Sequence, residues 1–175
     1  MRQAVASLIA ALAVAIAAPV FAQKAPKAGR QPLAAAMPAT GFAGIWIDDT
    51  GDGAVEIKPC VGTRTEALCG SIVWLKTGMD ASGKPLRDGN NEDAKDRGRP
   101  ICGLPTIGGL KRQPGGTLDD GWIYDPRRGQ KFDLELTLKG PDKLQVVGYK
   151  AFKFLSKTFI WSRAPANLPR CTPPV

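Results

Sequence analysis

The chain has 175 residues, four cysteines and no histidine, and its formal net charge is +8. Without histidine there is no Ser-His-Asp or Cys-His catalytic pair, no imidazole base and no histidine metal ligand. The length fits one ordinary domain. A hydrophobic content of 43% with 23% charged residues is typical of a globular protein. The composition therefore predicts a folded domain with few options for catalysis.

Residues 1–22 have the layout of a secretory signal peptide. Met1-Arg2 supplies a short positive start, residues 4–18 are almost all apolar, and Val20 and Ala22 stand at positions −3 and −1 of a cleavage site. The apolar run is shorter than the roughly 20 residues of a membrane-spanning helix. We expect cleavage after Ala22, a protein that does not span a membrane thereafter, and a periplasmic or secreted location. The alternative is an uncleaved membrane anchor.

An oxidising destination predicts that the four cysteines form two disulfides. Three connectivities are open. Cys60 and Cys69 flank one predicted turn, and their pairing leaves Cys102 to bond Cys171. The chain has no C-x-x-C sequence, which disfavours the alternatives of a four-cysteine metal site or a redox pair. We predict structural disulfides and neither a metal nor a cofactor.

One domain is expected, over residues 41–163. Residues 23–40 are rich in Ala, Pro, Lys and Gly and read as a flexible leader, and residues 164–175 form a Pro-rich tail. Within the domain, residues 76–100 form a long polar connection. Connections of that length are usually functional or disordered.

Alternation of apolar and polar residues predicts β-strands in this domain. The clearest run is 131–138, with Phe132, Leu134, Leu136 and Leu138 on one face. Residues 104–110 alone are expected to form a short helical turn. About seven strands at hairpin spacing predict an antiparallel sandwich or barrel, and a barrel is favoured because it leaves no exposed edge. The predicted strands are 44–47, 55–58, 70–75, 121–124, 131–138, 144–152 and 158–163.

A series of short motifs resembles a bacterial family of exported proteins, domain of unknown function 2147. The motifs are Gly44-Ile45-Trp46, Cys69-Gly70-Ser71-Ile72-Val73-Trp74-Leu75, Arg99-Pro100-Ile101-Cys102-Gly103-Leu104-Pro105, Gly121-Trp122-Ile123-Tyr124-Asp125-Pro126, Leu144-x-Val146-x-Gly148-Tyr149 and Trp161-Ser162-Arg163. The resemblance implies an all-β, antiparallel, calycin-like (lipocalin-like) barrel of seven or eight strands in a bacterial protein. It implies no reaction and no catalytic residue. The chain departs from the family's pattern at Ala151, where glycine is usual, and at Ser156-Lys157-Thr158, where Gly-Arg-Thr is common.

Gly44-x-Trp46, taken with Arg163, also resembles the Gly-x-Trp motif of lipocalins. There the first-strand tryptophan closes the base of the barrel beneath an arginine of the last strand. A guanidinium over an indole contributes roughly 0.5–2 kcal/mol. We predict that Arg163 lies over Trp46 in a structural role.

The acidic residues form no recognisable catalytic or metal-binding pattern. Residues 48–53 resemble a calcium loop, but Thr50 stands at position 3 and Pro59 at position 12, so a hairpin turn is favoured. Oxygen ligands in the long connection, among them Asp88 and Asn91, match no metal motif. A pair of catalytic carboxylates is disfavoured, because the candidates are expected in turns or on solvent-facing strand positions. Those candidates are Glu56, Asp125, Asp133 and Glu135.

Two binding hypotheses follow. In the first, a non-enzymatic barrel binds an apolar or amphipathic small molecule such as a lipid or acyl chain. Its candidate binding residues are Trp74, Tyr124, Tyr149, Phe152 and Phe154.

In the second hypothesis, the barrel is filled by its own side chains, and a basic surface binds an anionic envelope polymer or a partner protein. The export signal argues against nucleic acid as the partner. An internal cavity would favour the first hypothesis and a packed interior the second. The candidate basic surface comprises Arg127, Arg128, Lys150 and Lys153.

Overall fold

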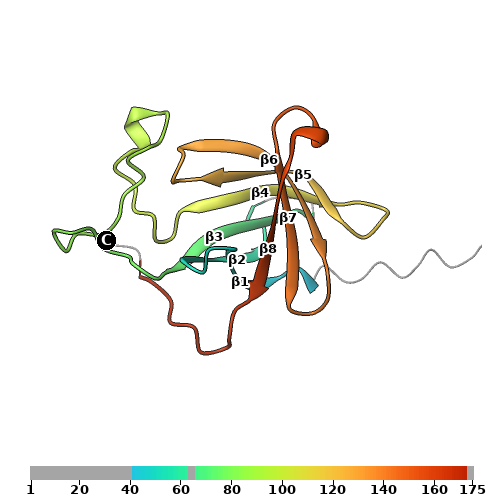
Figure 1. Cartoon of the computed structure of the whole chain (residues 1–175), viewed down its shortest axis with the longest axis horizontal. Helices are drawn as coiled ribbons and strands as arrows, with labels where there is room; N and C mark the ends of the chain where they lie inside the picture. The colour runs from blue at the N-terminus through green and yellow to red at the C-terminus, as the bar shows by residue number, and fades with distance from the viewer. Residues whose placement is uncertain (1–40, 63–65, 173–175) are drawn as a thin grey trace, which may run out of the picture. The chain divides into compact units, whose positions relative to one another are not determined.

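The computed structural model describes residues 41–62 and 66–172. Eight strands form a closed antiparallel barrel in which each strand pairs with its sequence neighbours and β1 also pairs with β8 (Figure 1). The all-β barrel predicted above is therefore confirmed. The predicted signal peptide, residues 1–22, and leader, residues 23–40, lie outside the described residues. The strands are β1 (Gly44–Ile47), β2 (Gly53–Pro59), β3 (Leu68–Leu75), β4 (Pro105–Arg112), β5 (Leu118–Asp125), β6 (Gln130–Leu138), β7 (Lys143–Tyr149) and β8 (Lys157–Arg163).

The prediction of a helical turn over residues 104–110 is wrong, because Pro105–Arg112 forms β4. Glycine is a poor helix former, and this segment contains Gly108 and Gly109. Gly108 also meets a packing requirement of the sheet. The Trp122 ring of β5 lies against it, and a Cβ at this position would come within 2.5 Å of the ring. Gly108 therefore belongs to a strand against which the Trp122 side chain packs closely.

The strand predicted over 144–152 is also too long, because β7 ends at Tyr149. Ala151 has a φ of +60°, which no strand accommodates, and the chain then forms the 3-10 helix η3 (Lys153–Leu155). The connection between β7 and β8 is thus a compact turn rather than an extension of the hairpin.

The interior of the barrel is filled by its own side chains. Register places Leu136 opposite Val146 and Leu144 opposite Trp161, and all four side chains are buried. Trp46 is fully buried in the same cluster. Protein interiors pack as densely as organic crystals, and small barrels are commonly filled in this way. A packed interior favours the second hypothesis, in which the protein functions through its outer surface.

Arg163 and Trp46 close one end of the barrel. The two residues are register partners on β8 and β1, and the guanidinium carbon lies 4.1 Å from the centre of the indole ring, the stacking that their motif predicts. The indole Nε1 donates a hydrogen bond to the carbonyl of Phe42 at 2.8 Å. The guanidinium donates to the carbonyls of Gly41 and Ala43 at 2.9 and 3.2 Å. One side chain therefore joins the last strand to the chain that enters the first.

Both predicted disulfides are present. Cys60–Cys69 links β2 to β3 across their hairpin, and Cys102–Cys171 links the long connection between β3 and β4 to the C-terminal tail. The backbone amide of Cys171 also donates to the carbonyl of Val73 at 2.8 Å. Because disulfides persist in oxidising compartments, the two bonds indicate an extracytoplasmic location.

Removal of either disulfide is expected to lower the free energy of unfolding. The bonds close loops of 9 and 69 residues. The chain-entropy model gives losses of about 3 kcal/mol for Cys60→Ser/Cys69→Ser and about 4 kcal/mol for Cys102→Ser/Cys171→Ser. Urea unfolding of the two double variants beside the unmodified protein measures both losses. A larger loss for the short loop would contradict this ranking.

Ala151→Gly is expected to stabilise the protein by about 1 kcal/mol, because glycine adopts a φ of +60° without a steric penalty. Ala81→Gly is the matched control. Ala81 is an exposed turn residue whose φ is not positive, so glycine there brings no such gain. Thermal unfolding of both variants measures the difference. A melting temperature for Ala151→Gly at or below that of the control would show that Ala151 is not strained.

Candidate functional site

The long connection between β3 and β4 is held against β5 by a buried carboxylate. Asp88 is fully buried and accepts hydrogen bonds from the Tyr124 hydroxyl at 2.6 Å, the Asn91 side-chain amide at 2.7 Å and the Arg99 guanidinium at 2.9 Å. A buried charge is costly unless it is paired and hydrogen-bonded, and here both carboxylate oxygens have donors. This network converts the predicted polar loop into an ordered wall beside the barrel.

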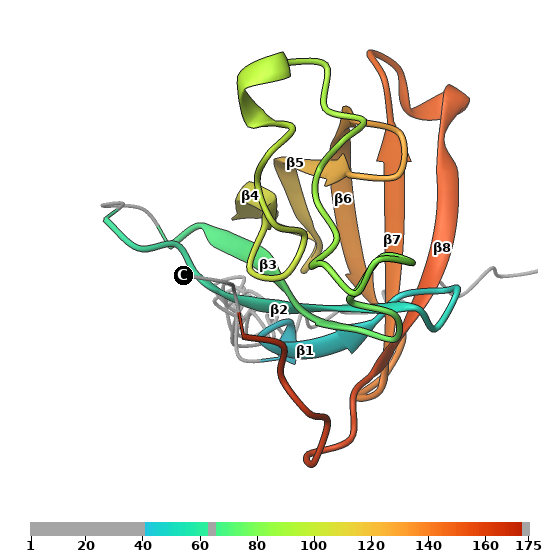
Figure 2. The same cartoon turned by 90° about the vertical axis from the view of Figure 1, so that its left-hand side faces the viewer.

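Three connections meet at one end of the barrel: the long one, the β5–β6 turn and the β7–β8 connection (Figure 2). The long connection carries the 3-10 helix η2 (Ala94–Asp96), which Asp93 caps through a bond from the Lys95 amide to its side chain. It also closely approaches the β5–β6 turn, where a Cβ on Gly129 would collide with the carbonyl oxygen of Asn90. These contacts bring η2 opposite the strands β5 and β6.

A cavity of about 460 Å³ lies between the long connection and these strands. Trp122 and Tyr124 line it from β5. Register pairs Trp122 with Asp133, one residue away from the buried pair Gly121 and Leu134, so Trp122 lies on the outer face of the barrel. The cavity is therefore formed against the outside of the barrel and under the long connection, separate from the packed interior.

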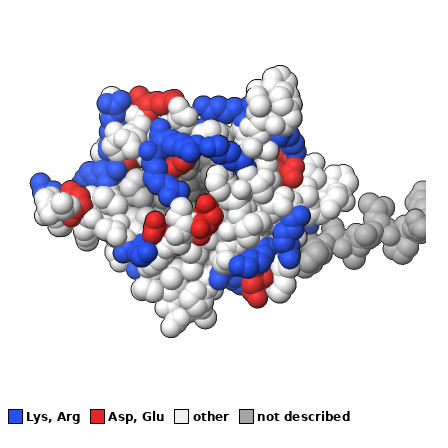
Figure 3. All heavy atoms as spheres, viewed as in Figure 1, with Lys and Arg blue, Asp and Glu red and all other residues white. Residues whose placement is uncertain are grey.

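The cavity has one basic side and one acidic side. Lys131 and Lys150 line it from the strand side, and Glu92, Asp93 and Asp96 line it from the region of η2. Figure 3 shows Lys and Arg side chains gathered around a hollow in the face viewed there. A ligand in this cavity would meet opposite charges on its two sides.

Lys131 and Lys150 differ from Arg99, the other basic residue that lines the cavity, in their ion-pair partners. The Lys131 ammonium lies 4.5 Å from the centre of the Trp122 ring, and the Lys150 ammonium donates to the Gln130 side chain at 3.3 Å. Within residues 41–62 and 66–172 neither lysine has a carboxylate partner. Arg99, by contrast, is bound to Asp88 and Asp96. Lys131 and Lys150 are thus the cations that a ligand can reach.

Both tyrosines of the chain donate hydrogen bonds to carboxylates. Burial raises the pKa of Tyr124 to about 12, and its bond to Asp88 adds to the shift. Burial also raises the pKa of Tyr149 to about 12, together with its 3.0 Å bond to Asp119. Each hydroxyl keeps its proton at neutral pH and acts as a fixed donor that positions neighbouring elements.

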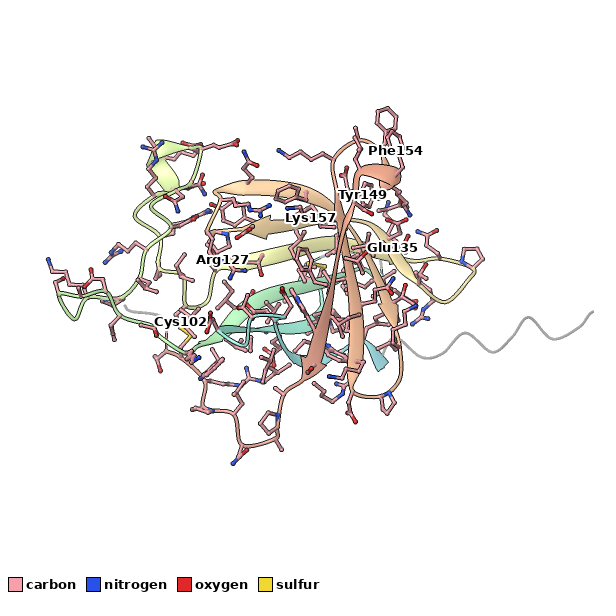
Figure 4. The ribbon with its side chains drawn as sticks, in the orientation of Figure 1. Cys102, Arg127, Glu135, Tyr149, Phe154 and Lys157 are labelled. Carbon is pink, nitrogen blue, oxygen red and sulfur yellow. A yellow bond between two sulfur atoms is a disulfide. The ribbon has the colours of Figure 1, made fainter. Side chains whose placement is uncertain are left out.

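Of the five residues proposed to bind an apolar ligand, Tyr124 lines the cavity. Trp74 lies opposite Ala54 on the β2–β3 pair, and Tyr149 is bonded to Asp119 on the outer face. Phe152 and Phe154 are 60% and 80% exposed in the β7–β8 connection, where Phe154 projects away from the barrel (Figure 4). The structure therefore does not bring the five together, and the two phenylalanines neither fill the interior nor line this cavity.

The four predicted basic residues are also dispersed. Arg127 and Arg128 both form ion pairs with Asp125 in the β5–β6 turn. Lys153 lies between two carboxylates, those of Asp119 and Glu135, which raise its pKa. Lys150 alone lines the cavity. Most of this basic surface is therefore paired within the molecule.

Sequence reasoning missed Trp122 and Arg99 as site residues, and it considered Lys131 only as a member of a basic group with Arg127 and Arg128. Trp122 and Lys131 both lie on the outer face of neighbouring strands, which the alternation of apolar and polar residues could have indicated. Their proximity, however, depends on the β5–β6 register. Asp88 and Arg99 meet because the connection folds back on itself, which no local pattern records. Three of the four acidic residues considered for catalysis have structural partners: Glu56 pairs with Arg170, Asp125 accepts a bond from the β5–β6 turn, and Glu135 pairs with Lys153.

The part of the chain that the structure describes contains no group of three Cys, Asp or Glu side chains placed to hold a metal ion. The predicted calcium-like segment is a turn in which Asp48 accepts bonds from the amides of Thr50 and Asp52. Across residues 41–62 and 66–172 there is also no helix with the length and hydropathy needed to traverse a bilayer.

The family model described as "Uncharacterized protein conserved in bacteria (DUF2147)" matches residues 44–163, which is more than half of the chain. The chain belongs to this family. Its match begins with β1 and ends with β8, so the family domain coincides with the barrel.

A solved structure, protein HP1028 from Helicobacter pylori, is described as belonging to the lipocalin family. It is 18% identical to this DUF2147 member, with a TM-score of 0.57, over 71% of this chain and 83% of that one. At this identity the likeness shows the fold, a lipocalin-like barrel. A search of curated proteins finds no match.

Spectrophotometric titration of the tyrosines tests the two buried hydroxyls. In the folded protein, tyrosinate is expected to form with midpoints of about 12, whereas the chain in denaturing guanidinium should titrate near pH 10. Because the folded-state pKa is raised, the stability that these hydroxyls contribute is complete below pH about 10 and is lost as the pH rises towards 12. Native midpoints near pH 10 would show that the tyrosines are not held in this way.

Proposed function

We propose that this DUF2147 protein is an exported, non-enzymatic binding protein that takes a small amphipathic anion in the cavity beside β5 and β6. The observation that carries the proposal is the combination of a half-buried indole, Trp122, with two lysines that have no carboxylate partner in the described chain. The cavity volume of about 460 Å³ falls within the range of small-molecule sites.

The anionic group of the ligand would bind Lys131 and Lys150. Lys131 already lies over the Trp122 ring, so a carboxylate, sulfonate or phosphate bound there places the adjoining apolar part of the ligand against the indole. On the opposite side, Asp93 and Asp96 are paired with Lys95 and Arg99, and Glu92, which has no ion pair in the described chain, would repel a second anionic group. The site therefore favours a ligand with a single anionic head and a neutral or cationic remainder.

The hydrogen bonds of the polar groups around the cavity support binding rather than catalysis. Tyr124, Asn91 and Arg99 are engaged with Asp88 and hold the wall of the cavity in place. The packed barrel interior supports a site on the outside, so a long acyl chain buried in the barrel is not proposed. The predicted signal peptide and the two disulfides support export to the periplasm or beyond.

The alternative function, attachment of an anionic envelope polymer to the basic surface, is less well supported. Of Arg127, Arg128, Lys150 and Lys153, three form ion pairs: Arg127 and Arg128 share Asp125, and Lys153 is bound by Asp119 and Glu135. Lys150 is the exception, and it belongs to the cavity.

The amphipathic anion 8-anilinonaphthalene-1-sulfonate is a suitable probe for the site, with its uncharged analogue N-phenyl-1-naphthylamine for comparison. We expect saturable binding of the sulfonate, detected by energy transfer from tryptophan. Lys131→Gln/Lys150→Gln should weaken that binding about ten-fold, because charged hydrogen bonds contribute on the order of 1.5–3 kcal/mol. Affinity for the uncharged analogue should be weaker and unchanged by the substitution.

Lys139→Gln is the matched control for this experiment. Lys139 is an exposed lysine in the β6–β7 turn at the opposite end of the barrel, so its loss removes a positive charge without touching the cavity. Equal sulfonate affinity in the unmodified protein, the control and the double variant would refute the proposed site. Native mass spectrometry of protein purified from cells would then identify any natural ligand that accompanies it.

A further inference from the structure

The β7–β8 connection presents an exposed apolar tip. Phe152, Phe154 and Leu155 are 60%, 80% and 68% exposed, and the two phenyl rings stack with their centres 5.5 Å apart. We refer to these three residues as the aromatic tip. Single exposed apolar residues are common on protein surfaces, but a contiguous apolar group on a protruding turn marks an interaction surface. Figure 4 shows Phe154 pointing away from the barrel.

The backbone of the aromatic tip needs few external partners. The amide of Phe152 donates to the carbonyl of Lys150, and the amide of Leu155 donates to the carbonyl of Phe152 within η3. At the base of the tip, Lys153 is bound by both Asp119 and Glu135, which join the connection to β5 and β6. The internal hydrogen bonds of these two amides lower the cost of bringing the turn into the headgroup region.

The charge next to the aromatic tip is positive. Lys150 precedes it and Lys157 follows it, and Lys157 is exposed. Neither has a carboxylate partner in the described part of the chain, whereas the acidic residues at the base, Asp119 and Glu135, are paired with Lys153. Cations beside exposed aromatic groups are the combination that binds an anionic lipid surface, because the apolar groups enter the headgroup region while the cations meet the phosphates.

A planar surface suits this tip better than a folded partner does. Three side chains bury at most several hundred Å², whereas a stable protein interface buries roughly 800 Å² on each partner. A second copy of the chain would have to find most of that area elsewhere. A bilayer needs no complementary groove, and each apolar group that enters adds to the affinity.

We propose that the aromatic tip docks the protein on an anionic bilayer, with Phe152, Phe154 and Leu155 inserted at the headgroup level and Lys150 and Lys157 against the lipid phosphates. This inference shares Lys150 with the proposed ligand site and otherwise rests on a different set of side chains, Phe152, Phe154, Leu155 and Lys157, at the same end of the barrel.

The test uses the exported protein as purified from cells, with its N-terminus defined by intact mass, and vesicles of phosphatidylcholine with or without one-third phosphatidylglycerol. Co-sedimentation should show binding to the anionic vesicles that weakens as salt is raised. Phe152→Ser/Phe154→Ser should lower the partition coefficient at least about ten-fold. Lys157→Glu should lower it about five-fold or more. Both changes affect exposed side chains, so thermal unfolding should confirm intact folds.

Two control variants make the same chemical changes at the other end of the barrel. Val61→Ser removes a side chain that is 92% exposed beside the β2–β3 hairpin, and Lys139→Glu reverses a charge in the β6–β7 turn. Both should bind vesicles like the unmodified protein. Unchanged binding by Phe152→Ser/Phe154→Ser would overturn the proposal, and so would equal losses in the controls.

Light scattering tests the alternative that the tip binds a second copy of the chain. A dimer that Phe152→Ser/Phe154→Ser dissociates would show that the tip binds a second copy of the chain and would also overturn membrane docking. The vesicle variants change Phe152, Phe154 and Lys157 and leave the shared residue Lys150 intact, so failure of sulfonate binding does not decide the vesicle experiment.

Discussion

Closure of eight short strands around a tightly packed interior is the constraint on which the rest of this molecule depends. A barrel of this size leaves room for side chains such as Trp46, Leu136 and Trp161 and for little else. Its base is sealed because Arg163 stacks on Trp46 and binds the carbonyls that precede β1. With the interior occupied, functional groups are displaced to the outer face of the strands and to the connections at the open end. The lipocalin-like architecture is therefore used here as a rigid support.

The buried carboxylate of Asp88 extends that support beyond the strands. A long polar connection has little apolar surface with which to order itself, and backbone ordering is entropically costly. Three donors converge on Asp88, one of them the hydroxyl of Tyr124 on β5, so the connection is fixed to the barrel by a single charge-assisted network. The same network keeps Tyr124, Asn91 and Arg99 beside the cavity. A preformed wall reduces the conformational entropy that a ligand would otherwise have to restrict on binding.

The cavity and the aromatic tip lie at the same end of the barrel, and Lys150 belongs to both. It lines the cavity through its side chain and begins the connection that carries Phe152 and Phe154. Docked through the tip, the protein would hold its cavity next to the bilayer surface. Lys153 ties the connection to Asp119 and Glu135, and the exposed Lys157 has no carboxylate partner in the described chain. Membrane contact and ligand capture would then be neighbouring events on one rigid scaffold.

Local patterns in the chain predicted the strands with strict alternation and favoured the observed pairing of the cysteines, because these depend on period and spacing. The stacking of Arg163 on Trp46 was predicted from the resemblance to the lipocalin motif. Local patterns failed at β4, where Gly108 and Gly109 carry no strand signal of their own and Gly108 is required by the Trp122 ring of the next strand. They also failed for the site. Lys131 meets Trp122 through the β5–β6 register, and Asp88 meets Tyr124 across 36 positions of sequence. Phe152 and Phe154 were predicted to bind an apolar ligand, yet they follow the left-handed turn at Ala151 and are exposed to solvent. Which side chains are exposed and which charges are paired depend on contacts between segments that are distant in sequence. Only the tertiary structure of the closed barrel decides them.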